Sequence, residues 1–273
     1  MKTPISVPSY LFLKDLGVPE AKVCIPSPTL LHFGAAKIPK ISKHAYPDGD
    51  QFGSSFFKDL ASCYRQELTA LYKAGCRYIQ LDETSLALMC DPKFQKIIQE
   101  RGYNFDDLLQ QYVTLINEAL DIPERNELTI SMHSCRGNYK AMWLAEGGYD
   151  TVAKALFADI KVDCHFLEFD SQRAGGFEPL KYLAKEKTVC LGLVTSKTSQ
   201  LEDKQAIVER IYKAAEIVPL ERLCLSAQCG FASTHHGILL QRSRSHLIIG
   251  NPMTEEDQWA KVRLIVEVCH CTL

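Results

Sequence analysis

The amino-acid sequence predicts an α/β fold, a TIM-type (β/α)8 barrel. Short apolar runs alternate along the chain with amphipathic helical stretches, and repeated β-then-α units imply a parallel sheet with right-handed crossovers. Residues with catalytic or metal-binding chemistry follow several different runs. In a barrel such residues lie at the carboxyl ends of many strands, whereas an open doubly wound sheet concentrates them at one switch point. These observations favour the barrel.

The predicted strands are compact apolar runs without a polar/apolar alternation, which is typical of strands that are covered on both faces. Six runs have this character, and they are Lys22–Pro26, Arg77–Asp82, Leu128–His133, Cys164–Phe169, Thr188–Val194 and Leu223–Ala227.

Helices are predicted between the strands from apolar residues at helical spacing. Asn104 and Thr254 are suited to cap helices, since short polar side chains satisfy the free N–H groups of a first turn. Gly75 is suited to end one, because glycine adopts the left-handed conformation of many helix ends. The predicted helices are Phe56–Ala74, one that follows Asn104, Tyr149–Phe157, Lys204–Val218 and one that follows Thr254.

Composition places the chain among globular proteins with one large domain, residues 1–273. The 273 residues are 46% hydrophobic and 23% charged, with a formal net charge of −2, so the chain can bury a sizeable core. No long basic block is present, and we expect no nucleic-acid partner. No apolar run approaches the ~18 residues that span a bilayer, and we expect no membrane association.

The cysteine content predicts a reducing, cytoplasmic location. The chain has 11 cysteines and does not need a disulfide scaffold at this length. We expect the cysteines in or beside apolar strand-like runs to be buried free thiols, which behave as small hydrophobes. These are Cys24, Cys76, Cys164, Cys190 and Cys224.

Four residues at strand ends form a ligand set for one zinc ion: His133, Cys135, Glu168 and Cys229. His133 and Cys135 are two residues apart, so their side chains leave an extended strand on the same face. Carboxyl ends of barrel strands that are distant in sequence converge on one face, where the four side chains can meet. Zinc accepts imidazole, thiolate and carboxylate ligands, and it holds a thiol as thiolate near neutral pH.

With these residues the chain resembles the catalytic barrel of cobalamin-independent methionine synthase, and more closely its shorter relatives that lack a duplicated N-terminal barrel. The resemblance spans nearly the whole chain in the right order. It is carried by four motifs, which are Gln80–Glu83, His133–Asn138, Phe166–Asp170 and Ser226–Phe231.

The resemblance implies transfer of a methyl group from 5-methyltetrahydrofolate, or a related donor, to the zinc-bound sulfur of homocysteine. It places the zinc ligands at the four residues named above, with Glu168 also taking part in catalysis through its displacement by the substrate thiol. Asp82 corresponds to a carboxylate that holds the substrate's amino group and is the other predicted catalytic residue. Glu83 and Gln228 are further predicted substrate-binding residues.

The chain departs from the family pattern in three places. It begins with a strand that resembles the third of the family barrel, so we expect the first strands to be lacking and the domain to be truncated at its N-terminus. Thr195–Lys197 stands where long family members have a histidine thought to handle protons. The stretch Ile238–Asn251 resembles an insertion, and the loop-like segment Phe231–Met253 that contains it is a predicted lid.

Some alternatives stay open. Arg136 and Arg173, just beyond strand ends, fit either a carboxylate or folate partner or a solvated loop. The zinc site could be purely structural. A metal-free barrel of the uroporphyrinogen-decarboxylase type would hold an arginine-rich pocket. A truncated, non-catalytic paralogue would cover its open sheet edges by forming a homo-oligomer, because such edges invite pairing.

Overall fold

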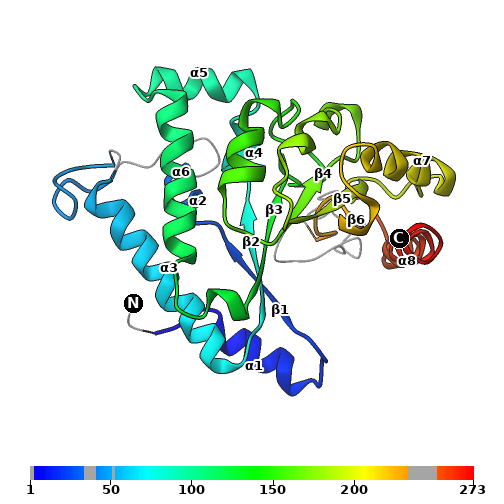
Figure 1. The fold of residues 1–273 in the computed structure, drawn as a ribbon, viewed down its shortest axis with the longest axis horizontal. Coiled ribbons are helices and arrows are strands. Elements are labelled where there is room, and N and C mark those ends of the chain that lie inside the picture. The colour runs from blue at the N-terminus through cyan, green and yellow to red at the C-terminus, as the bar shows by residue number, and fades with distance from the viewer. Residues whose placement is uncertain (1–2, 34–40, 51–52, 233–250) are drawn as a thin grey trace, which may run out of the picture.

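The computed structural model describes residues 3–33, 41–50, 53–232 and 251–273. In this part of the chain, six parallel strands form one sheet, and each strand pairs with the next along the sequence (Figure 1). The strands are β1 (Lys22–Pro26), β2 (Tyr78–Glu83), β3 (Thr129–Ser134), β4 (Cys164–Glu168), β5 (Thr188–Val194) and β6 (Leu223–Ala227).

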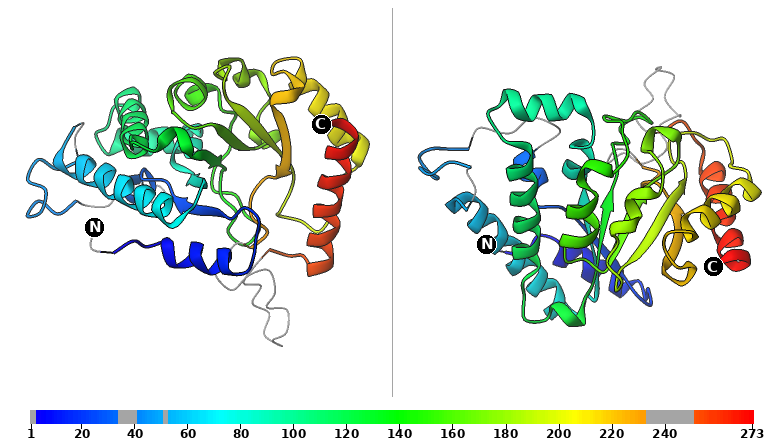
Figure 2. Two further views of the ribbon diagram at one scale, coloured as in Figure 1. Left: turned by 60° about the horizontal axis from the view of Figure 1, so that its bottom comes forward. Right: turned by 45° about the horizontal axis from the view of Figure 1, so that its top comes forward.

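Helical segments connect the strands and flank the sheet, with α3 and α6 toward the β1 side and α8 beside β6 (Figures 1 and 2). The α-helices are α1 (Val7–Asp15), α2 (Leu30–Phe33), α3 (Ser55–Ala74), α4 (Ser85–Leu88), α5 (Pro92–Glu100), α6 (Phe105–Leu120), α7 (Lys204–Ala215) and α8 (Glu255–Thr272). The 3₁₀ segments are η2 (Arg125–Glu127), η3 (Asp150–Val152), η5 (Gln172–Ala174), η6 (Glu178–Tyr182) and η7 (Leu220–Arg222), and η4 (Ala155–Asp159) is a π-helix.

The sheet order confirms the predicted fold class. Six parallel strands whose sequence neighbours are also spatial neighbours are arranged as consecutive strands of a TIM-type barrel. Strands β1 and β6 are the two edges, and within the described residues they do not pair with each other. None of the helices in these segments combines the length and the apolar character that crossing a bilayer requires.

The predicted strands agree with the structure to within one residue at each end. The predicted caps are also confirmed. The Asn104 side chain accepts hydrogen bonds from the first turn of α6, Gly75 ends α3 with a φ of +103°, and Thr254 forms a capping box with Asp257 at the start of α8. Local sequence chemistry therefore sets these boundaries.

The predicted helix over Tyr149–Phe157 is helical in the structure, but it is not a regular α-helix. The structure has the 3₁₀ segment η3 followed by the π-helix η4. The ammonium of Lys187 donates to the carbonyl oxygens of Phe157, Ala158 and Ile160 at 2.6–3.2 Å. This tertiary contact satisfies the carbonyls at the end of the segment without a regular α-helical turn, and local periodicity cannot reveal it.

The two faces of the sheet differ in burial, and the difference corrects the prediction for two cysteines. Outward strand residues such as Ile79 and Leu81 are buried in the core. Cys76 and Cys190 are buried and Cys164 is half-buried, but Cys24 and Cys224 are exposed. Cys24 and Cys224 lie on the inner face of the edge strands β1 and β6, which no described strand covers.

A buried histidine on β4 provides a first testable prediction. His165 is fully buried, and neither ring nitrogen has a hydrogen-bond partner among the described residues. Burial, with a smaller contribution from Lys187, lowers its pKa to about 3. An unpartnered buried polar group costs about 1–3 kcal/mol. We therefore expect His165→Leu to raise the free energy of unfolding by about 1 kcal/mol at neutral pH.

The same substitution should reduce sensitivity to acid. The folded-state pKa of His165 lies below its ordinary value of 6.5, so below pH 6.5 the unfolded chain binds a proton that the folded chain does not. As the pH is lowered below 6.5, the free energy of unfolding therefore decreases by up to about 1.4 kcal/mol per pH unit. Urea denaturation at pH 7.5 and 5.5 should show the advantage of His165→Leu growing on acidification, whereas His44→Gln, at an exposed site, should match the wild type. An unchanged or lower midpoint for His165→Leu at both pH values would contradict this account.

Candidate metal centre

The end of β3 presents His133 and Cys135 on the same side. Ser134, between them, is paired with Glu83 on the opposite face of the sheet, as the alternation of strand side chains requires. His133 lies next to Asp82 and Phe166 in the register of the sheet. Both predicted ligands of this motif therefore start from one rigid strand.

Cys229 joins them from the loop after β6. The ligand atoms of His133, Cys135 and Cys229 all lie within 4.8 Å of one another. The Gln228 backbone N–H donates to the Val194 carbonyl oxygen at 2.8 Å, which holds the loop against β5. One imidazole and one thiol from the end of β3 thus converge with a second thiol from the loop after β6.

The two thiols lie close enough for one to donate a hydrogen bond to the other. The hydrogen bond from the Cys135 thiol, followed by contributions from His133 and Lys197, lowers the pKa of Cys229 to about 4. The pKa of Cys135 moves upward, because its thiol is the donor and is buried. A site that stabilises one thiolate in this way is suited to a soft cation.

His133 is held by the surrounding structure. Its Nε2 donates to the Gln228 carbonyl oxygen at 3.0 Å, and its Nδ1 lies 3.7 Å from Oδ1 of Asp82. Because a carbonyl oxygen only accepts, Nε2 carries a proton in this arrangement. Metal-binding histidines usually have their second nitrogen fixed in this manner.

The cluster lies on the wall of a cavity of about 790 Å³. Asp82 also lines it, with a side chain that is 42% exposed. Burial opposes ionisation of Asp82, but hydrogen bonds from His133 and Gln80 outweigh it and lower the pKa. The cavity therefore combines a candidate metal centre with an ionised carboxylate on the neighbouring strand. No arginine lines it among the described residues, which is not the lining that the metal-free barrel alternative predicts.

Glu168 ends β4 but lies outside the group of three ligand atoms. Its carboxylate is fully buried and meets Arg173, Lys197 and Arg136. These cations lower its pKa against the opposing effect of burial. Its predicted place as the fourth zinc ligand stays a prediction.

The other two predicted substrate residues do not line the cavity. Glu83 follows Asp82 on the same strand and so faces the helices. It accepts hydrogen bonds from the Thr29 hydroxyl and from the Leu86 N–H. The Gln228 side chain is 1% exposed and donates to the Ser196 hydroxyl at 2.6 Å. Their predicted contact with substrate remains untested.

Sequence reasoning missed the loops that close around the centre. Asn138 donates to the Gly230 carbonyl and the Ser196 hydroxyl, and Asn251 donates to Asn138 and the Ser196 carbonyl. These bonds join the segments after β3, β5 and β6. The positions of these residues just beyond strand ends could have marked them as candidates. The sequence alone does not show which amide side chain bonds to which partner. Residues 233–250, most of the predicted lid, lie outside the described residues.

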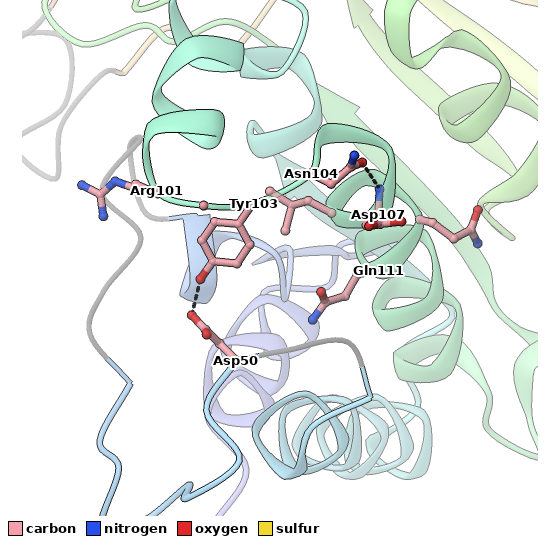
Figure 3. A pocket seen from close by; sticks show the side chains of 9 residues that line it. Asp50, Arg101, Tyr103, Asn104, Asp107 and Gln111 are labelled. Carbon is pink, nitrogen blue, oxygen red and sulfur yellow. Dashed lines mark hydrogen bonds between the residues drawn. The ribbon is translucent and has the colours of Figure 1, made fainter.

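A second cavity, of about 630 Å³, opens where α5 meets α6 (Figure 3). Its lining residues are separate from those of the first cavity. Asp50 accepts hydrogen bonds from Tyr103 and from the buried His32, whose other ring nitrogen meets the Tyr112 hydroxyl at 2.7 Å. This network ties the segment before α3 to α2 and α6, which is a structural role.

The donor set fits zinc. Two cysteines and one histidine are common zinc ligands, and three protein ligands with an open fourth position are typical of catalytic rather than structural sites. The buried Glu168 ends the neighbouring strand β4.

Comparison with known proteins agrees with this geometry. The family model described as "Cobalamin-independent synthase, Catalytic domain" matches residues 39–241. The uncharacterized protein YxjH of Bacillus subtilis is 40% identical over 264 residues, covering 96% of this chain and 64% of its own length. A methionine synthase of Pyrococcus horikoshii is 28% identical over 185 residues, covering 68% of this chain and 44% of its own length.

A solved structure shares the fold. A Listeria monocytogenes protein assigned as a vitamin-B12-independent methionine synthase superposes with a TM-score of 0.73 at 33% identity, covering 99% of this chain and 70% of that one. The chain spans about 64% of the length of the Bacillus relative.

Proposed function

The chain belongs to the family of cobalamin-independent methionine synthase catalytic domains, and on that premise we propose that it is a zinc-dependent methyltransferase. The proposed reaction moves a methyl group from 5-methyltetrahydrofolate to the thiol of homocysteine and yields methionine. The observation that carries the proposal is the convergence of His133, Cys135 and Cys229 on the wall of a cavity that also contains Asp82.

The proposed roles follow from the donor atoms. His133, Cys135 and Cys229 hold the metal, and Glu168 is the carboxylate available for the fourth position. Bound zinc supplies a Lewis acid that keeps a substrate thiol deprotonated, because only a few per cent of a free thiol with a pKa of about 8.5 is thiolate at pH 7. Gln228 orients the His133 ring through its carbonyl oxygen.

Asp82 is the proposed partner of the substrate ammonium group. Gln80 donates to its Oδ1 at 2.7 Å, and Lys22 donates to the Gln80 side-chain oxygen at 2.8 Å. This chain of hydrogen bonds keeps the carboxylate ionised and pointing into the cavity. An amino acid that carries a thiol could then bind at two points, with its sulfur at the metal centre and its ammonium at Asp82.

The proposed location is the reducing cytoplasm. All 11 cysteines are free thiols in the structure, and the two proposed thiol ligands bind metal only when reduced.

The function is tested by methionine formation. Purified chain loaded with zinc and given homocysteine and 5-methyltetrahydrofolate should produce methionine, and a chelator should abolish the product. Zinc binding without product from this donor or any other methyl donor would favour the non-catalytic alternative. Absence of zinc binding would overturn the proposal altogether.

Substitution of Asp82 tests the substrate contact. We expect Asp82→Asn to raise the KM for homocysteine by about 10-fold or more, since a hydrogen bond to a charged group contributes about 1.5–3 kcal/mol. A thiol acceptor without an amino group should be used equally well by both proteins. Asp107→Asn, in the second cavity, is the control. An equal change for both acceptors would show that Asp82 does not contact the ammonium group.

A further inference from the structure

Cys229 lies two residues beyond the end of β6, in a bend of the chain that belongs to no helix or strand. Loop positions are more mobile than strand positions, whereas a metal centre needs ligand atoms that the protein holds in place. Both sequence neighbours of Cys229 are held by side-chain amides. The Gln228 amide donates to the Ser196 hydroxyl at 2.6 Å, and the Asn138 amide donates to the Gly230 carbonyl oxygen at 2.8 Å. Hydrogen bonds on either side of Cys229 therefore restrict where its thiol can lie.

Asn138 reaches this loop from the segment after β3, three residues beyond the ligand Cys135. Both N–H groups of its amide are used, one by the Gly230 carbonyl oxygen and the other by the Ser196 hydroxyl at 3.1 Å. Its amide oxygen accepts a hydrogen bond from Nδ2 of Asn251 at 3.0 Å. The Asn138 side chain therefore connects the two segments that carry the thiol ligands, and Asn251 sets the orientation of that side chain.

Asn251 is 2% exposed and uses both ends of its amide. Its Nδ2 also donates to the Ser196 carbonyl oxygen at 2.6 Å, and its Oδ1 accepts the Ala141 backbone N–H at 2.8 Å. Lys140 and Ala141 have φ angles of +51° and +61°, and residues other than glycine stay in this left-handed region only where surrounding contacts hold them. Asn251 thus supports the strained turn after Asn138 as well as the Asn138 side chain.

We propose that Asn138 and Asn251 are positioning residues that clamp Cys229 beside the other two ligands of the metal centre. This inference rests on the proposed function and adds to it the residues that keep the loop ligand in place. Asn251 acts through other residues, since its amide bonds to Asn138, Ser196 and Ala141 and it does not line the metal cavity within the described segments. A buried amide network with every donor paired fixes one arrangement, so the clamp keeps the ligand atoms together before a metal binds.

The first test compares two asparagine variants by metal binding. Asn251→Ala should weaken zinc binding about 10-fold in competition with a chelator, which is the effect expected when a residue that supports a metal ligand is lost. The sulfur-to-metal charge-transfer band of the cobalt-substituted variant should weaken as well.

Asn117→Ala is the matched control, because Asn117 makes the same kind of contact at the amino end of β4. Its Nδ2 donates to the Asp159 carbonyl oxygen at 2.9 Å, and its Oδ1 accepts the Lys161 N–H at 2.8 Å. This variant should lower the thermal unfolding midpoint by an amount comparable to that of Asn251→Ala. It should leave the zinc affinity and the cobalt spectrum unchanged.

A metal-free measurement reads the placement of Cys229 without zinc. Diamide, an azo oxidant, takes two hydrogen atoms from a pair of neighbouring thiols and leaves a disulfide. Peptide mass spectrometry should show the disulfide between Cys135 and Cys229 forming about 10-fold more slowly in Asn251→Ala than in the wild type, because reaction within a protein depends on how closely the reacting atoms are held. Asn117→Ala should react as the wild type does.

Asn138→Ala completes a double-mutant cycle and, at a half-buried site, provides the same test if Asn251→Ala does not fold. Because both asparagines act on Gly230 through one link, the double variant should lose no more than about twofold in zinc affinity beyond the weaker-binding single variant. Losses that multiply would overturn the inference. Wild-type zinc affinity and disulfide rate in Asn251→Ala would also overturn it, as would an equal loss of zinc affinity in Asn117→Ala. A wild type that binds no zinc would overturn the proposed function, and slower disulfide formation in Asn251→Ala would then still support the clamp.

Discussion

Gly192→Ala is expected to destabilise the protein by about 3 kcal/mol and to disrupt the metal centre. A Cβ atom at Gly192 would lie 2.5 Å from the Leu167 carbonyl oxygen and 2.7 Å from the Gln228 Cα. Both atoms are backbone, so relief requires strand β4 or the Cys229 loop to move. Overpacking of this kind typically costs 1–3 kcal/mol and occasionally more.

The matched control is Gly230→Ala, two residues beyond Gln228. There the nearest atom to an added Cβ is the Ala232 carbonyl oxygen at 3.9 Å, and we expect a change within about 1 kcal/mol. Urea denaturation of the two variants and of the wild type measures the difference, and zinc binding reports on the loop. A Gly192→Ala variant with the wild-type midpoint and full zinc affinity would show that this backbone contact does not position Cys229.

Removal of either thiol ligand is expected to have the largest effect on the chemistry. Cys135→Ala or Cys229→Ala should weaken zinc binding by more than about 100-fold and should abolish methyl transfer. Mutation of a residue that only hydrogen-bonds to a metal ligand already weakens metal binding about 10–100-fold. Ser134→Ala, between the two ligands of β3 but on the opposite face, should bind zinc normally. Affinities measured by chelator competition decide the matter, and full affinity in either cysteine variant would remove that residue from the site.

The strands and the core of the metal site could be predicted from sequence because both depend on short-range rules. Compact apolar runs located β1, β5 and β6 to the residue. A spacing of two placed His133 and Cys135 on one face, and parallel strands brought Cys229 to the same edge. The family comparison confirms the resemblance to a known family, and the chemistry that the resemblance implies stays a proposal.

Other features of the structure could not be predicted from the sequence, because tertiary contacts decide them. Strand alternation alone argues against Asp82 and Glu83 both facing the cavity, and the structure places Glu83 toward the helices. The partners of Glu168 come from the segments after β3, β4 and β5, and no local pattern shows that Arg136, Arg173 and Lys197 meet there. Cys24 and Cys224 look like core residues because their runs are apolar, yet they lie on edge strands.

The measurement that most directly tests the central claim is zinc X-ray absorption on the loaded wild-type protein, before and after homocysteine is added. Three protein ligands with a fourth position for the substrate thiol predict two sulfur neighbours before addition and three afterwards. Zinc surrounded by nitrogen and oxygen alone, or a sulfur count that homocysteine does not change, would contradict the account.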